Sequence, residues 1–133
     1  MKTVCATLLL TLIAATLGCG YSSKNSAPVP GAMPMISQLD PNAATAGGAA
    51  FTLTINGTNF GTKAVVSWNG AAQTSITAYV SSNQLTMAVP ASMIATRGTV
   101  QITVTNPGTP GMGPYGSGGT LPETSSPMSF TIQ

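Results

Sequence analysis

Most of the chain after residue 34 alternates between apolar and polar side chains. The clearest runs, with an apolar residue at every second position, cover residues 51–55, 65–68, 85–89, 100–105 and 128–132. Strict alternation buries one face of a strand and leaves the other in water, as in antiparallel sheets. Weaker strands are expected at residues 35–39 and 74–80, and no segment after the leader repeats with the 3.6-residue period of a helix. The pattern therefore predicts an all-β domain of about seven short antiparallel strands, which is typical of a β-sandwich.

Two Asn-Gly pairs, Asn56-Gly57 and Asn69-Gly70, interrupt this pattern. Asn-Gly favours the positive φ angles that tight turns need. Both pairs are therefore predicted to be turns between strands. Asn56-Gly57-Thr58 also matches the N-glycosylation pattern, but we interpret it as a turn.

The first 34 residues differ from the rest of the chain. Lys2 precedes an apolar run, Val4–Leu17, which is shorter than the about 20 residues of a membrane-spanning helix. Residues 1–18 are therefore predicted to be a secretory signal peptide. Residues 19–34 are rich in Ser and Pro and are predicted to form a flexible tether. Residues 35–133 then form one domain.

The end of the leader carries a second motif. The stretch Thr16-Leu17-Gly18-Cys19 resembles the lipobox of bacterial lipoproteins, in which a small residue precedes a Cys that becomes the first mature residue. The resemblance implies that Cys19 is the lipid-attachment site, with a thioether to diacylglycerol and an added N-acyl chain such as palmitate. Two or more acyl chains give stable anchoring, so we expect the chain at the bacterial cell envelope, facing the periplasm or the surface. Ordinary signal-peptidase cleavage, with Cys19 as a bystander, is the alternative.

The composition excludes several classes of function. Charged residues are 5% of the sequence, against roughly 25% in a typical soluble domain. The chain has no His, its only carboxylate side chains are Asp40 and Glu123, and its only cysteines are Cys5 and Cys19 in the leader. Catalysis and metal binding draw mainly on these residue types, so the sequence predicts no enzyme, no metal and no cofactor. The few basic residues are scattered, which argues against a nucleic-acid partner.

An ordered set of short segments in residues 35–133 resembles the IPT/TIG domain family. The segments are Ile36–Pro41, Ala46–Gly61, Val66–Gly70, Gln84–Pro90, Gly98–Pro107 and Ser129–Ile132. The resemblance implies an immunoglobulin-like fold and no particular activity, because family members serve as receptor modules, adhesin spacers and accessory domains. We expect a monomeric, non-catalytic binding or structural module without a disulfide. A carbohydrate-binding accessory domain that works beside a separate hydrolase is the alternative.

Two features bear on partner binding. Trp68, the single Trp of the chain, alternates in phase with Val66, so we predict a core residue rather than a platform for stacking on sugars. Residues 107–127 are longer than the family's usual connection into the last strand, and long loops in compact domains are usually functional or disordered. This loop is predicted to lie beside residues 57–63 and to contain no strand in its centre. Its candidate contacts for an envelope protein or a glycan are Tyr115 and Met112, and a tolerated insertion is the alternative.

Overall fold

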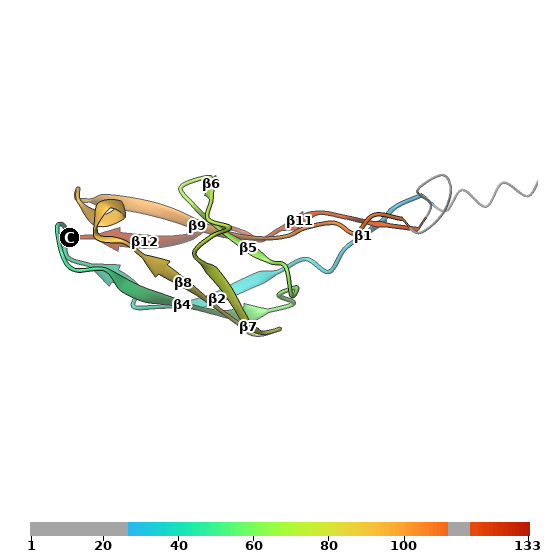
Figure 1. Ribbon diagram of the computed structural model, residues 1–133, viewed down its shortest axis with the longest axis horizontal. Coiled ribbons are helices and arrows are strands. Elements are labelled where there is room, and N and C mark those ends of the chain that lie inside the picture. Colours follow the sequence, from blue (N-terminus) through green and yellow to red (C-terminus); the bar gives the residue numbers. More distant parts are fainter. Residues whose placement is uncertain (1–26, 112–117) are drawn as a thin grey trace, which may run out of the picture.

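The computed structural model describes residues 27–111 and 118–133, which form two packed β-sheets and a narrow arm that extends from one end (Figure 1). The strands are β1 (Val29–Pro30), β2 (Met35–Asp40), β3 (Ala43–Ala44), β4 (Phe51–Thr58), β5 (Val65–Trp68), β6 (Ala71–Ala72), β7 (Thr77–Ser81), β8 (Gln84–Val89), β9 (Gly98–Asn106), β10 (Thr120–Leu121), β11 (Glu123–Thr124) and β12 (Met128–Ile132). A 3-10 helix, η1 (Ala91–Ile94), connects β8 to β9. No α-helix occurs in the two described ranges.

The strands of the sandwich are divided between two sheets. One sheet has the order β2-β4-β8-β7 and the other the order β3-β12-β9-β5-β6. All these pairs are antiparallel except β3 with β12, which is parallel. The short β3 follows β2 in the chain but belongs to the opposite sheet, so this segment ties the two sheets together. The prediction of an all-β sandwich is confirmed, and the seven expected strands correspond to β2, β4, β5, β7, β8, β9 and β12.

The core lies between the sheets and follows the alternation in the sequence. Leu53 and Ile55 of β4, Leu85 and Met87 of β8 and Phe130 of β12 are fully buried, while their chain neighbours face water or the sheet edge. Burial of such side chains is the main stabilising contribution to a fold of this kind. No buried side-chain nitrogen or oxygen atom in the described ranges lacks a hydrogen-bond partner.

Three aromatic rings meet in this core. The ring of Trp68 is 5.4 Å from that of Phe130, with an angle of 51° between the planes, and the ring of Phe51 stacks on Phe130 at 6.0 Å. Trp68 is only 8% exposed. The prediction that Trp68 is a core residue is therefore confirmed, and its indole is not available as a sugar platform.

The two Asn-Gly pairs adopt different structures. Asn69-Gly70 forms the predicted turn between β5 and β6, with φ angles of 50° and 85°. The prediction of a turn at Asn56-Gly57 is wrong, because both residues lie inside β4 and pair with neighbouring strands. Gly57 is required there by close packing, since a Cβ atom would collide with the carbonyl oxygen of Met35 and the ring of Phe60. The turn comes later, around Asn59, where φ is 60°.

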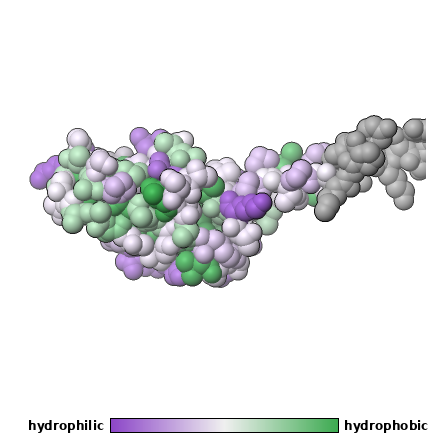
Figure 2. Space-filling model, viewed as in Figure 1, coloured by the Kyte–Doolittle hydropathy of each residue, from purple (hydrophilic) through white to green (hydrophobic). Residues whose placement is uncertain are grey.

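The strand expected over residues 74–80 is β7, which begins later and ends one residue further on. Residues 74–76 belong to a turn, in which the backbone N–H and the hydroxyl of Thr77 both donate to the carbonyl oxygen of Gln73, at 3.1 and 2.6 Å. At its other end β7 has a bulge between Tyr79 and Ser81. Figure 2 shows an apolar area at the lower edge of the molecule, where β7 runs in Figure 1.

The arm consists of residues 27–34, 107–111 and 118–124. Beyond the sandwich β9 and β11 remain paired, with Glu123 opposite Asn106, and an antiparallel bridge joins Thr109 to Thr120 further out. The N-terminal segment adds a third strand, because β1 runs parallel to β10 with Val29 opposite Thr120. Figure 1 shows this segment and the β9–β12 connection running side by side away from the two sheets.

The arm corrects two expectations from the sequence. The connection 107–127 is not an unstructured loop in its described parts, but a continuation of the β9–β12 hairpin. The tether expected over residues 19–34 is not a free linker from residue 27 onward, because β1 is paired and Pro34 is fully buried. Both expectations failed for the same physical reason. These segments are held together by backbone hydrogen bonds, and small residues allow their close approach, so they show no alternation of apolar and polar positions in the sequence.

Candidate functional site

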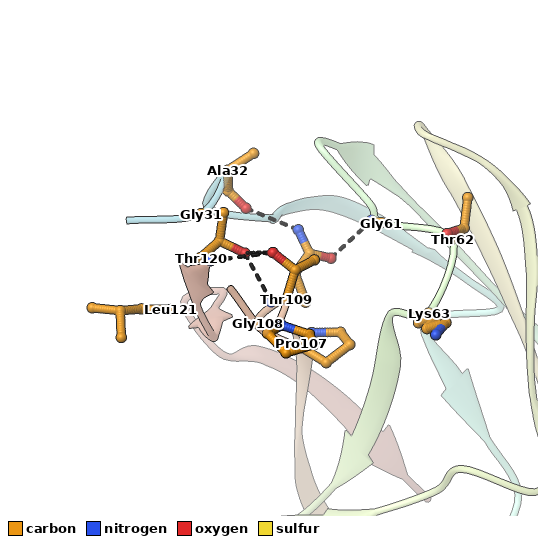
Figure 3. Close-up of a pocket in the computed structure, with 12 residues that line it drawn as sticks. Gly31, Ala32, Gly61, Thr62, Lys63, Pro107, Gly108, Thr109, Thr120 and Leu121 are labelled. Carbon is orange, nitrogen blue, oxygen red and sulfur yellow. Dashed lines mark hydrogen bonds between the residues drawn. The ribbon is translucent and has the colours of Figure 1, made fainter. Parts of the chain in front are cut away.

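A pocket of about 340 Å³ opens where the arm leaves the sandwich (Figure 3). Three segments line it: residues 31–32 of the arm, residues 61–63 before β5, and the hairpin at residues 106–110 and 120–121. Its volume is at the lower end of the range of about 300–1,000 Å³ that is typical of small-molecule sites. The loop at 57–63 and the connection after β9 therefore lie together, as the sequence predicted.

Asn106, the last residue of β9, connects the three segments through its side chain. Its Oδ1 accepts a hydrogen bond from the backbone N–H of Gly61 at 2.8 Å. Its Nδ2 donates to the carbonyl oxygens of Ala32 and Asn59, at 2.8 and 2.7 Å. An amide matches this arrangement because it offers one acceptor and two donor hydrogens. One half-buried side chain thus fixes the arm against the end of the sandwich.

The outer wall of the pocket is the Thr109–Thr120 pair. The two residues exchange backbone hydrogen bonds of 3.1 and 3.0 Å, and their hydroxyl oxygens are 3.0 Å apart. Each Thr follows a Gly, and these glycines permit the close approach. A Cβ atom on Gly108 would meet the carbonyl oxygen of Thr120, and one on Gly119 would meet that of Thr109.

The pocket offers backbone groups, the amide of Asn106, threonine hydroxyls and one cation. Among the described residues of the lining, Lys63 is the only charged one, and Figure 3 places it across from Pro107 and Gly108. The side chain of Leu121 points away from the pocket in the same view, and this residue is 48% exposed. The described residues of the lining include no carboxylate or thiol that could work with Lys63 in acid–base or nucleophilic catalysis.

The two carboxylates singled out in the sequence, Asp40 and Glu123, are not among the residues that line this pocket. Asp40 ends β2 in the sandwich, while Glu123 lies in β11 at the base of the arm. Cys19, Met112 and Tyr115 lie outside the described residues. The predicted lipid attachment and the predicted partner contacts therefore stay predictions.

Asn106 and Lys63 were not identified from the sequence as site residues. Asn106 stands in the segment Thr105-Asn106-Pro107 at the end of a strand, where a short amide side chain often bonds to neighbouring backbone. The arm had a weak signal as well. The dipeptide Gly-Thr occurs on both sides of the connection, at residues 108–109 and 119–120, and these are the positions that pair.

No group of three or more His, Cys, Asp or Glu side chains in residues 27–111 and 118–133 is placed to hold a metal ion. In that part of the chain, no helix has the length and the apolar character needed to cross a membrane.

The comparisons with known proteins address the family. The profile of the IPT/TIG domain family matches residues 34–126, which include strands β2 to β11 and every pocket residue named above except Gly31 and Ala32. Two strands lie outside the match: β1 in the arm, and β12, which completes the second sheet by pairing with β9. No curated protein matches the sequence.

Proposed function

The chain belongs to the IPT/TIG domain family of generally non-catalytic, immunoglobulin-like modules, and on this premise we propose that it is a lipid-anchored module of the bacterial cell envelope. In this proposal the signal peptide of residues 1–18 is removed and Cys19 carries the acyl chains. The sandwich then acts as a binding or structural unit on the outer side of a membrane, as a monomer. Its candidate contacts are the pocket at the base of the arm and the residues Met112 and Tyr115.

The observation that carries the proposal is the path of the N-terminal segment. Residues 27–34 form one segment of the arm and lead into the sandwich at β2 (Figure 1). The pairing of β1 with β10 and the hydrogen bonds of Asn106 hold this segment in place. A chain anchored through Cys19 would therefore reach the sandwich through a paired ribbon. This arrangement holds a domain at a distance from a surface better than a single strand of Ser and Pro residues does.

The carbohydrate-binding alternative has no support from the described surface. Sugar sites usually gather several exposed aromatic rings, and Trp68 is buried in the core. Tyr79 is the one aromatic residue among the exposed large apolar side chains of the described ranges. A single Tyr beside the bulge in β7 does not form a platform.

The test compares the two cysteines. Cells that express the wild type, Cys19→Ser or Cys5→Ser are labelled with a fatty acid and separated into membrane and soluble fractions. We expect Cys19→Ser to abolish labelling and to release the protein from membranes, since its acyl chains are lost. Cys5→Ser is the matched control, because Cys5 lies in the apolar run of the leader and is removed with it.

Retained labelling and membrane binding in Cys19→Ser would contradict the proposal. Loss of labelling in Cys5→Ser alone would place the modification elsewhere. Ordinary cleavage at the same site, the alternative, predicts an unlabelled and soluble wild type.

A further inference from the structure

The hairpin loop between β5 and β6 presents an Asn-Gly pair in an open position. The pairing of Trp68 with Ala71 leaves Asn69 and Gly70 as a two-residue loop, and both are exposed. β6 is only two residues long and forms the edge of its sheet. No hydrogen bond within the described ranges holds the side-chain amide of Asn69, and the space around Gly70 is empty, because a Cβ atom there would meet nothing within 4 Å.

From this geometry we propose that Asn69 is a site of spontaneous deamidation. The backbone nitrogen of Gly70 attacks Cγ of Asn69 and forms a five-membered succinimide, while the side-chain nitrogen leaves as ammonia with the proton of the attacking amide. Water then opens the ring. Attack at one carbonyl gives aspartate, and attack at the other gives isoaspartate, in which the main chain passes through the side chain. The only other reactant is water, which the exposed loop admits.

The second Asn-Gly pair of the same chain is an internal control. Asn56 lies inside β4, between β2 and β8. Its Oδ1 accepts a hydrogen bond from Nε2 of Gln84 at 3.0 Å, and the N–H of Gly57, which would be the nucleophile, donates to the carbonyl oxygen of Asn83 at 2.9 Å. Ring closure at Asn56 therefore needs local unfolding of a central strand, which costs a large part of the unfolding free energy.

The two sites differ in what the reaction has to disturb. At Asn69 the backbone must rotate only within a two-residue loop next to a short edge strand. The glycine of this loop, Gly70, imposes no steric barrier to the rotation. Each product adds a negative charge to a chain whose carboxylate side chains are Asp40 and Glu123 alone. Isoaspartate also lengthens the loop by one main-chain atom, which disturbs the fit of a two-residue turn.

The test is a time course on the purified, folded wild-type protein at mildly alkaline pH. Peptide mapping by mass spectrometry measures conversion at Asn69 and Asn56 separately. We expect Asn69 to convert more than about tenfold faster than Asn56, since each 1.4 kcal/mol of protection slows a reaction tenfold. A parallel time course in denaturant removes the protection, and the two sites should then convert at similar rates.

Equal rates at the two sites in the folded protein, or slower conversion at Asn69, would overturn the proposal. A folded Asn69→Gln variant serves as the second measurement, because the longer side chain forms its ring less readily. If the same gain in negative charge appears in that variant at the wild-type rate, the modified residue is not Asn69.

Discussion

The sandwich and the arm are held together by different forces. Every member of the hydrophobic core lies in the sandwich, whereas only Pro34 and Gly119 are buried among the described residues of the arm. The arm depends instead on backbone pairing, on the Thr109–Thr120 hydroxyl contact and on the side chain of Asn106. A paired ribbon with so few buried groups is marginal by itself. The comparison indicates that the arm keeps its shape because it continues β9, a strand that the sandwich already fixes.

This difference implies that the two regions respond differently to mutation. Loss of a core side chain should lower the stability of the whole domain, because the sheets unfold together. Loss of an arm contact should open the arm locally and leave the sheets folded. Two substitutions and one deletion test this difference between the sandwich and the arm, and they are given in order of decreasing expected effect.

The largest effect is expected from Trp68→Ala. The indole packs against Phe130 at 5.4 Å between ring centroids, and truncation of a buried Trp typically costs about 3–5 kcal/mol. Since small domains have about 5–15 kcal/mol in total, the variant should unfold or lose a large part of its stability. Urea denaturation followed by circular dichroism measures the change.

The matched control is Tyr79→Ala in the edge strand β7. Tyr79 is 40% exposed, and substitutions on the surface usually change stability by about 0.5 kcal/mol or less. A near-neutral Trp68→Ala would contradict the assignment of Trp68 to the core. A large loss in Tyr79→Ala would show that β7 contributes more than its exposure indicates.

The sandwich could be predicted from the sequence because its buried side chains recur at regular intervals along each strand. Leu53 and Ile55, or Ile102 and Val104, appear at every second position because each strand has one buried face. The sequence predicts a turn at Asn56-Gly57, where the structure has a strand, because the dipeptide Asn-Gly has two different roles in this chain. At residues 69–70 it supplies positive φ angles, and at Gly57 it only makes room for the Met35 carbonyl.

The arm and the pocket could not be predicted in this way. Their pairing joins Val29 and Pro30 to Thr120 and Leu121. Strands of two residues are too short to show an alternation of apolar and polar positions, so this distant contact leaves no periodic signal in the sequence. Asn106 illustrates the limit. Its three partners are the backbone groups of Gly61, Ala32 and Asn59, and a backbone group has no signature in the sequence.

An intermediate effect is expected from Asn106→Ala. The variant loses three hydrogen bonds, each worth about 0.5–1.5 kcal/mol net, so the full loss would be about 1.5–4.5 kcal/mol. We expect the lower half of this range because the side chain of Asn106 is only half-buried. The loss should be concentrated at the base of the arm. Hydrogen exchange should accelerate at the amide of Gly61, whose acceptor is Oδ1 of Asn106, while the amides of β4 and β8 keep their protection.

Two further variants sharpen this prediction. Asn42→Ala is the control, since Asn42 is exposed and its side chain makes no hydrogen bond in the described ranges. Asn106→Asp keeps an acceptor for Gly61 but places a carboxylate oxygen against the carbonyl oxygens of Ala32 and Asn59, so it should be no better than Asn106→Ala. Full stability in Asn106→Asp would contradict the assigned orientation of the amide.

The smallest effect on stability is expected from removal of residues 112–117. The paired part of the arm closes at Thr109 and Thr120, so the short deletion leaves every described strand intact and should change the unfolding free energy by about 0.5 kcal/mol or less.

A longer deletion, 111–119, tests the same ribbon. It also removes Gly119, whose carbonyl oxygen accepts a hydrogen bond from the N–H of Val29 at 3.1 Å. Only the longer deletion should therefore release β1, which hydrogen exchange at the amide of Val29 would detect. If Val29 stays equally protected in both variants, the ladder does not hold β1, and the bond from Asn106 to Ala32 is sufficient.

The same pair of deletions separates binding from structure. Because the short deletion removes Met112 and Tyr115 and leaves the arm paired, a partner that contacts either residue should lose affinity for this variant without any change in melting temperature. Interface hot spots are enriched in Tyr, so Tyr115→Ala alone should reproduce most of that loss. A partner that binds the short deletion as well as the wild type, but not Asn106→Ala, would instead locate the contact at the pocket beside Lys63, at the base of the arm.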